Sequence, residues 1–318
     1  MLAKDLITEN VDISKNILVA YSGGPDSTAL IHLLSSLKVD EDINVKAIHI
    51  NHNLSKKSNL WEKHCREKCI KLDIDLIVES VDIKSDGGGL EAASRKARYD
   101  IFEKLLNKDD QLLLGHHSDD VAETVFMRLL RGTGIEGMEG PQQRRSIGRG
   151  ILIRPLLEVS KKDILDYLLA KKINFIEDDS NQSNDFDRNF LRNEIFPLLE
   201  ERWNNFPKRI NKTSLILRNR NQIYIELLNQ KHSDIIGETI DLKKIRTVPK
   251  QIAIDIIRFS IKKCNIAAPN SKIIEEIVKT FINSNPGPKS LVTWSRSDKE
   301  EVAGKITYEN GCMIISKR

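Results

Sequence analysis

The chain passes from an apolar run at 16–21 into a helical pattern through Ala20-Tyr21-Ser22-Gly23-Gly24-Pro25-Asp26-Ser27-Thr28-Ala29-Leu30. Two adjacent glycines let the backbone approach an anion without a Cβ in the way. Free N–H groups at the start of the following helix favour negative charge. Pro25 suits the first turn of that helix, where its missing N–H is not needed. The segment therefore predicts a phosphate-binding loop between a buried strand and a helix.

The side chains of this loop indicate how a nucleotide would be held. The hydroxyls of Ser22 and Ser27 can donate to phosphate oxygens, whereas the Asp26 carboxylate would repel them and suits a Mg²⁺ ion that bridges them. No Lys follows the glycines, and the Gly-x-Gly-x-x-Gly pattern is absent, so neither a Walker-type loop nor a dinucleotide site is expected. The alternative is a tight turn in which the glycines serve geometry alone.

Strand-like and helix-like segments alternate on both sides of the loop. This alternation predicts an α/β fold, a doubly wound and mainly parallel five-stranded sheet with helices on both faces. The predicted strands are 16–21, 44–50, 74–81, 111–114 and 151–153, and the predicted helices between them are 27–38, 60–72, 91–106 and 119–131. Ser160 is expected to cap a further helix, and 190–202 to form another that Pro197 could interrupt.

The C-terminal third differs from the rest in charge and in pattern. From Phe206 onward 21 Lys and Arg stand against 11 Asp and Glu, while the whole chain carries only +4, so residues 1–205 are net acidic. We expect one domain at 1–205 and a smaller, basic, mostly helical domain at 206–318, which could bind a polyanion such as nucleic acid and ends in a short β element at 290–315. A basic surface without a partner is the alternative.

Composition narrows the class of protein. Hydrophobic residues make up 40% and charged residues 30%, as in folded globular proteins. No apolar run approaches the roughly 18 residues of a membrane span, and the N-terminus lacks a secretory signal, so no membrane association and a cytoplasmic location are expected. Four cysteines form no disulfide framework, and Cys65 and Cys69 are expected to be small buried residues of one helix face.

A second cluster follows the fourth predicted strand, in 115–124. His116 is expected at the carboxyl end of that strand, where open α/β sheets bind ligands. Asp120 and Glu123 are three apart, so both carboxylates share one helix face. They could hold Mg²⁺ or take a proton from an attacking amine. The alternative is a favourable interaction of acids with the positive end of a helix.

Further candidates flank these two clusters. Arg95 and Arg98 share a helix face and could clamp phosphates or RNA, with paired surface charge as an equal alternative. His49 and His52 face opposite sides of a strand, so a shared zinc is not expected. His52 is expected at the strand end, near the nucleotide. Residues 132–140 are glycine-rich and are expected to form a mobile loop. Four arginines after it could contact RNA phosphates: Arg144, Arg145, Arg149 and Arg154.

Together these motifs resemble the PP-loop ATP pyrophosphatase superfamily and, within it, the tRNA(Ile)-lysidine synthetase family. The resemblance covers roughly 15–205, with matching pieces at 22–27, 49–52, 91–99, 115–123, 131–140, 154–157, 178–181 and 188–192. It implies a reaction of ATP, L-lysine and the wobble cytidine of a CAU-anticodon tRNA(Ile), through an adenylated cytidine, to lysidine, AMP and pyrophosphate. The resemblance also implies that 1–205 is the PP-loop catalytic domain and that 206–318 is a tRNA-binding domain. Longer relatives carry a further C-terminal domain, which this chain is expected to lack.

The resemblance also implies roles for named residues. Asp26, Asp120, Glu123 and Arg192 are expected to be catalytic, with Arg188 as an alternative to Arg192 and Asp26 as the Mg²⁺ ligand. ATP is expected to contact Ser22, Gly23, Gly24, Pro25, Asp26, Ser27, His52 and His116, and tRNA or phosphate to contact Arg95, Arg98, Arg131 and Arg188. The oligomeric state is left open, with a homodimer as one option. The alternatives are a PP-loop tRNA thiolase and a non-catalytic tRNA-binding protein.

Overall fold

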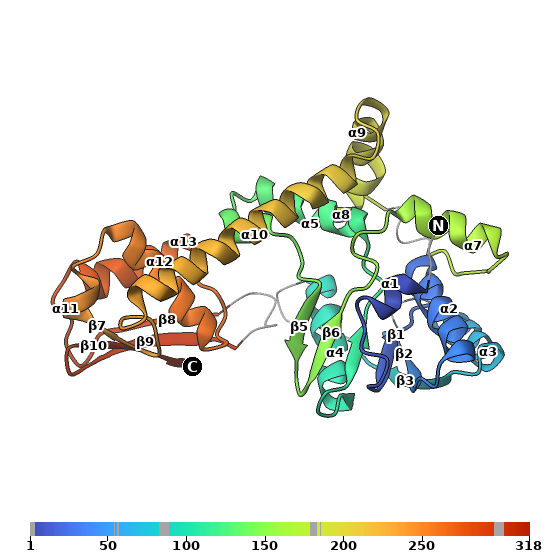
Figure 1. Cartoon of the computed structure of the whole chain (residues 1–318), viewed down its shortest axis with the longest axis horizontal. Coiled ribbons are helices and arrows are strands. Elements are labelled where there is room, and N and C mark those ends of the chain that lie inside the picture. The colour runs from blue at the N-terminus through green and yellow to red at the C-terminus, as the bar shows by residue number, and fades with distance from the viewer. Residues whose placement is uncertain are drawn as a thin grey trace. The chain divides into compact units, whose positions relative to one another are not determined.

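The computed structural model describes residues 4–53, 55, 57–82, 89–178, 183–184, 186–295 and 302–318 (Figure 1). The chain forms two compact units. The first comprises Met1–Lys84 and Ala97–Asn219, and the second comprises Ser85–Lys96 and Arg220–Arg318. The division falls inside helix α10 (Phe206–His232), which begins at the domain boundary expected from the sequence.

The first unit alternates strands and helices, as the sequence predicts. Its elements before α10 are α1 (Asp5–Thr8), β1 (Ile17–Ala20), α2 (Pro25–Asp40), β2 (Val45–Asn51), α3 (Ser58–Lys71), β3 (Asp75–Ser80), α4 (Leu90–Leu105), β4 (Gln111–Leu113), α5 (Ser118–Leu130), α6 (Ile135–Met138), β5 (Arg144–Ile147), β6 (Gly150–Ile153), α7 (Lys161–Ala170), α8 (Asp187–Phe190), the π-helical turn η2 (Leu191–Ile195) and α9 (Phe196–Arg202). The first residues of α4 belong to the second unit.

The sheet of the first unit has the order β3-β2-β1-β4-β6-β5. Its first five strands are parallel, and β5 pairs antiparallel with β6 through the register Arg144↔Ile153 to Ile147↔Gly150. The predicted α/β class is confirmed, but the sheet has six strands rather than five. The sixth was missed because Arg144 and Arg145 mark β5 as a polar edge strand, which lacks the apolar run of a central one.

Helices cover both faces of this sheet because alternate strand residues point in opposite directions. Ile17 and Val19 of β1 pack in one core with side chains of α2, α3 and α7. Leu18, between them, packs in a second core with Tyr99 and Phe102 of α4. Two separate cores on one strand are what a doubly wound sheet requires.

The strand order reverses at β1, whose two neighbours are β2 and β4. Both pairs are parallel, so the carboxyl ends of β1 and β4 lie at the same edge of the sheet. Ligands of open α/β sheets bind at such a reversal. The loop from β1 to α2 and the loop from β4 to α5 both start here.

The helical run from 187 to 202 contains a π-helical turn directly before Pro197. A proline supplies no N–H to the preceding turn, and the widened η2 turn accommodates this loss. The expected interruption at Pro197 is therefore a local widening of the helix, and it lies in the segment that carries Arg192.

The second unit has its own hydrophobic core and an antiparallel sheet of the order β7-β10-β9-β8. Its elements after α10 are β7 (Thr239–Asp241), α11 (Leu242–Ile245), α12 (Lys250–Lys263), α13 (Ser271–Ile277), the π-helical turn η3 (Val278–Ile282), β8 (Leu291–Trp294), β9 (Gly304–Glu309) and β10 (Cys312–Lys317). The expected terminal β element is thus part of a four-stranded sheet, because β7 joins it from a distant part of the sequence.

Candidate functional site

The loop between β1 and α2 has the geometry of an anion cradle. Gly23 has φ +84°, in the left-handed region that favours glycine, and a Cβ there would lie 2.5 Å from Ile176 Cδ1. Gly24 is the N-cap of α2, and Pro25 is its first residue, as predicted. The hydroxyl oxygens of Ser22 and Ser27 lie 3.1 Å apart, and the Ser22 N–H donates to Ser27 Oγ. The loop is therefore shaped by its own hydrogen bonds.

The loop between β4 and α5 touches the first loop. A Cβ on Gly115 would lie 3.0 Å from the carbonyl carbon of Asp26 and 3.1 Å from the Ser27 nitrogen. Only a residue without a side chain lets the two backbones approach this closely. The predicted neighbourhood of residues 22–27 and the start of α5 is confirmed by this contact.

His117 lies at the centre of three carboxylates and was not singled out from the sequence. It is the N-cap of α5, and its Nε2 lies 3.5 Å from both Asp26 Oδ1 and Asp120 Oδ2. Its Nδ1 lies 3.6 Å from Asp119 Oδ2. Burial opposes protonation, but Asp120, Asp119 and Asp26 outweigh it and raise the pKa of His117. The raised pKa favours the imidazolium form of His117, beside acids from the first turns of α2 and α5.

Lys161, the first residue of α7, was also missed as a site residue. Its ammonium donates to Asp26 Oδ1 at 2.6 Å, and its backbone N–H donates to Asp119 Oδ2 at 3.0 Å. A signal was present in the sequence, since a lysine in the first turn of a helix opposes the helix dipole. Ser160 caps α7 by accepting from the Asp163 N–H, as predicted.

Asp120 and Glu123 bind two arginines that come from far along the chain. Arg188 Nη2 donates to Asp120 Oδ1 at 2.6 Å, and Arg188 Nε donates to Glu123. Arg192 binds both oxygens of Glu123, at 2.7 and 3.0 Å. Only 1% of the Glu123 side chain is exposed. The expected shared face of Asp120 and Glu123 is thus occupied by the two arginines that the family resemblance had indicated.

Asp120 keeps its charge in this environment. Burial opposes ionisation, but His117 and Arg188 outweigh it and hold the pKa of Asp120 well below its usual range. Its Oδ2 also accepts the His117 N–H and completes a capping box. A carboxylate with so low a pKa is a weak base and a good partner for a cation.

His116 and His52 lie at the same edge of the sheet as neutral imidazoles. Burial, reinforced by the nearby charge of Arg98, lowers the pKa of His116 to about 3 and that of His52 to about 4. Arg154 donates to His116 Nδ1 at 3.3 Å, which leaves Nε2 as the protonated nitrogen. Arg154 is itself buried and also binds the Gln142 carbonyl, so its expected contact with RNA phosphates is wrong.

The remaining candidates are only partly placed. Arg131 lies 3.7 Å from Asp187 in an exposed ion pair. Arg95 belongs to the second unit and stays a prediction. Residues 132–140, expected as a loop, contain the one-turn helix α6. Part of the motif at 178–181 and of the glycine run at 87–89 lies outside the described residues.

The side chains of the site could bind Mg²⁺ only together with oxygen ligands from a substrate. In the described parts of the chain, no three His, Cys, Asp or Glu side chains are arranged to hold a metal ion. Mg²⁺ commonly takes one or two carboxylates and completes its shell with water and substrate phosphates. Asp26 suits this role because it adjoins the phosphate loop and its side chain is 30% exposed.

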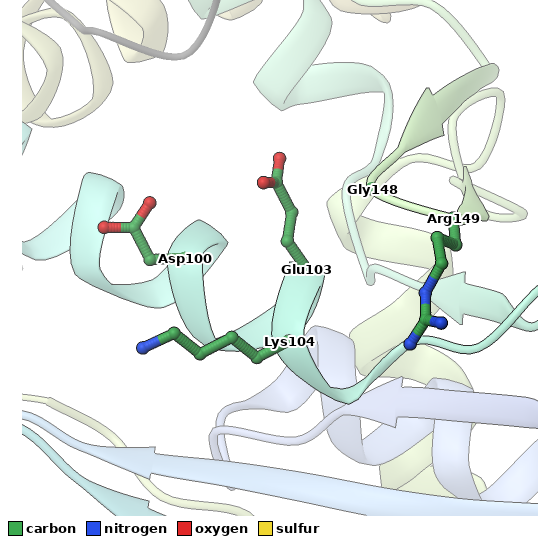
Figure 2. A pocket seen from close by; sticks show the side chains of 5 residues that line it. All are labelled: Asp100, Glu103, Lys104, Gly148 and Arg149. Atoms are coloured by element: carbon green, nitrogen blue, oxygen red, sulfur yellow. The ribbon is translucent and has the colours of Figure 1, made fainter.

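A surface hollow of about 340 Å³ lies elsewhere in the first unit (Figure 2). It is lined by Asp100, Glu103, Lys104, Gly148 and Arg149, and Figure 2 shows its charged side chains pointing in different directions. The turn at 148–149 precedes β6, so the hollow lies at the amino edge of the strands. It is therefore distinct from the site at their carboxyl edge.

Across the described residues, no helix is long and apolar enough to cross a membrane.

Fold and site together define an α/β nucleotide-binding domain of the PP-loop class, and a family model for the PP-loop domain matches residues 3–199. The chain is 34% identical over 291 residues to a tRNA(Ile)-lysidine synthase of Buchnera aphidicola from Acyrthosiphon pisum, which covers 90% of this chain and 66% of that relative. Its identity to the Buchnera aphidicola synthase from Baizongia pistaciae is 35% over 297 residues, with 92% and 67% covered. The chain belongs to the tRNA(Ile)-lysidine synthase family.

Two further findings set the scope of this relationship. The chain spans between about half and two thirds of the length of the curated relatives it matches. A solved structure of the U34-tRNA thiolase NcsA from Methanococcus maripaludis aligns with a TM-score of 0.53 at 18% identity, over 68% of this chain and 77% of that one. This likeness shows a shared fold.

Proposed function

We propose that this protein ligates L-lysine to C2 of the wobble cytidine of a CAU-anticodon tRNA(Ile), using ATP and passing through an adenylated cytidine. The products are lysidine, AMP and pyrophosphate. The observation that carries the proposal is the close approach of the phosphate loop, at Asp26, to Gly115 and to His117, the N-cap of the acidic helix α5. One site can then receive both ATP and an amine. The names of the relatives in the family support the choice of substrates.

The first half of the proposed reaction belongs to the phosphate loop. The C2 oxygen of cytosine is a poor leaving group, and its attachment to AMP makes it a good one. The backbone N–H groups after Gly23 and the hydroxyls of Ser22 and Ser27 would orient the triphosphate. Asp26 would hold Mg²⁺, which offsets charge on the departing pyrophosphate. His52 and His116, neutral at the same edge, would contact the nucleotide without adding charge.

The second half belongs to the start of α5. The ε-amine of lysine is protonated in water, with a pKa of about 10.4, and a carboxylate attracts that form. Asp120 would bind the ammonium, and because its pKa is low the proton would pass to solvent rather than to this carboxylate. The neutral amine would then attack C2, and the C2 oxygen would leave with AMP. Glu123 would hold Arg188 and Arg192 in position, because both of its oxygens accept from guanidinium groups. We propose that Arg192, the more exposed arginine, reaches the adenylate or the RNA.

The cysteines do not favour a sulfur-transfer reaction. Cys65 packs behind the phosphate loop, where its sulfur would lie 3.1 Å from a Cβ on Gly23. Burial raises the pKa of both the Cys65 and the Cys69 thiol to about 12. A buried thiol of this kind is not a nucleophile at neutral pH.

The basic second unit would serve to seat the tRNA, since excess Lys and Arg attract phosphates.

A transfer assay tests the proposal. Purified protein, CAU-anticodon tRNA(Ile) transcript, Mg²⁺, ATP and labelled lysine should give lysine-labelled tRNA and an equal amount of pyrophosphate. A transcript whose wobble cytidine is replaced by uridine serves as control and should stay unlabelled. Sulfur incorporation without lysine incorporation would support a thiolase, and tRNA binding without pyrophosphate release would support a non-catalytic role. Either result would contradict the proposal.

A further inference from the structure

Lys161, which pairs with Asp26 in the site, has no role in the reaction described so far. The Lys161 ammonium lies 2.6 Å from Asp26 Oδ1, and both side chains are about one third exposed, at 33% and 30%. A ligand in the phosphate loop can therefore reach both groups. Asp26 is the second residue of α2, and Lys161 is the first residue of α7. The pair joins the phosphate loop to a helix 135 residues further along the chain.

The backbone fixes Lys161 in this place. Its N–H donates to Asp119 Oδ2, and the Ser118 N–H donates to the carbonyl of Val159, two residues before it. The start of α7 is thus tied to the start of α5. A positive side chain is unfavourable in the first helical turn, because the turn already carries partial positive charge. The cost of placing Lys161 there is offset by an anion, and Asp26 is that anion in this structure.

We propose that Lys161 is a phosphate-binding residue, which releases Asp26 when this carboxylate takes up Mg²⁺ and moves its ammonium onto the pyrophosphate part of ATP. The inference rests on the proposed function. Asp26 Oδ1 cannot serve an ammonium and a divalent cation at full strength, since the two cations repel each other. The β and γ phosphates are the anions that ATP would bring to the same loop. A flexible four-carbon side chain allows the ammonium to change partners without movement of α7.

The next residue offers a matched control. Lys162 follows on the same helix, but its side chain is 81% exposed and pairs with Asp166 four residues on. Loss of its charge changes the net charge of the protein by the same amount as loss of Lys161. Of these two lysines, Lys161 contacts the phosphate loop at Asp26 and Lys162 pairs with Asp166 instead.

Binding measurements on the full chain test the inference without reliance on turnover. Isothermal titration with inorganic pyrophosphate in the presence of Mg²⁺, and separately with AMP, is carried out on wild type, Lys161→Met, Lys161→Arg and Lys162→Met. We expect Lys161→Met to weaken pyrophosphate binding about tenfold, the effect of one lost charge-assisted hydrogen bond. AMP binding should change less than about twofold. Lys161→Arg should recover most of the lost affinity, and Lys162→Met should match wild type.

The Mg²⁺ dependence gives a second readout. The Mg²⁺ concentration that half-saturates pyrophosphate binding should fall in Lys161→Met, because the competing ammonium is gone from Asp26. Unchanged pyrophosphate affinity in Lys161→Met would overturn the inference. Equal losses for pyrophosphate and AMP, or no recovery in Lys161→Arg, would also overturn it, since they would assign Lys161 to the shape of the loop alone. Failure of lysine transfer by wild type with these binding results intact would instead contradict the proposed function.

Discussion

The phosphate loop and the acid–arginine cluster of α5, α8 and η2 adjoin each other, but they are built by different means. The loop depends on backbone geometry, with a left-handed glycine at 23 and a close contact at Gly115. The cluster depends on charge balance, with Asp120 and Glu123 set against Arg188 and Arg192. A backbone site fails when an atom is added, whereas a charge cluster fails when a charge is removed. The comparison predicts different consequences for substitutions in the two regions.

The largest effect is expected for Gly23→Ala. The new Cβ would clash with Ile176, and φ +84° is strained for alanine. A displaced cradle should weaken ATP affinity about 100-fold, as measured by titration. Gly132→Ala is the control, since Gly132 also has a positive φ of +73° but open space around it. If Gly23→Ala bound ATP like this control, the account of the loop as a backbone site would be wrong.

Removal of one charge from the cluster should act on stability first. Glu123→Gln leaves two guanidinium groups with a weaker partner, and the loss of a buried partner typically costs about 3–5 kcal/mol. Because Arg188 and Arg192 are partly exposed, we expect about 2 kcal/mol of unfolding free energy, measured by urea denaturation. Glu194→Gln, an exposed acid of η2, should change stability by less than about 0.5 kcal/mol. Equal losses of unfolding free energy in both variants would show that the acid–arginine cluster does not stabilise the first unit.

Two neighbouring histidines should respond to pH in opposite ways. The pKa of His116 is lowered to about 3, so its stabilising effect is full above the unfolded value of about 6.5 and is lost as the pH falls below it. The pKa of His117 is raised, so its stabilising effect is full below about 6.5 and is lost as the pH rises through the folded value. Melting temperatures from pH 4 to 9 should show a flatter acid side in His116→Asn and a flatter alkaline side in His117→Asn. The same change in both variants would contradict the assigned environments.

The smallest effect on stability is expected at the rim of the site. Arg131 pairs with Asp187 in solvent, with 67% of its side chain exposed, so Arg131→Ala should cost less than about 0.5 kcal/mol. If Arg131 contacts a tRNA phosphate, the same variant should reduce the salt dependence of tRNA binding by about one ion. Filter binding at several salt concentrations measures this slope. An unchanged slope would exclude Arg131 from the RNA contact.

The phosphate loop could be predicted from the sequence because its determinants are contiguous. Two glycines, a proline and two serines between a strand and a helix specify one local geometry, and the structure has it. The edge strand β5 was missed since Arg144 and Arg145 hide its pattern. Arg154 was misread because a buried arginine and an exposed one look alike in sequence.

The charge cluster could be predicted only in part. The shared helix face of Asp120 and Glu123 follows from their spacing, but the ion pairs with Arg188 and Arg192 join positions 65 to 69 residues apart. Such pairs depend on how α8 and η2 pack against α5, and the local sequence pattern does not determine this packing. Lys161 and His117 were missed for the same reason, since both owe their roles to Asp26 on another helix.

In the proposed reaction, one site divides the two steps between these regions, with adenylation at the phosphate loop and lysine transfer at the start of α5. A single-turnover experiment with ATP labelled in its α-phosphate tests it most directly. Wild type should move the label onto CAU-anticodon tRNA without lysine and release it as AMP when lysine is added. Asp26→Asn should not label the tRNA, and Asp120→Asn, checked for folding by its melting curve, should label the tRNA but release AMP slowly. Label that never enters the tRNA in wild type, or equal behaviour of the two variants, would contradict the account.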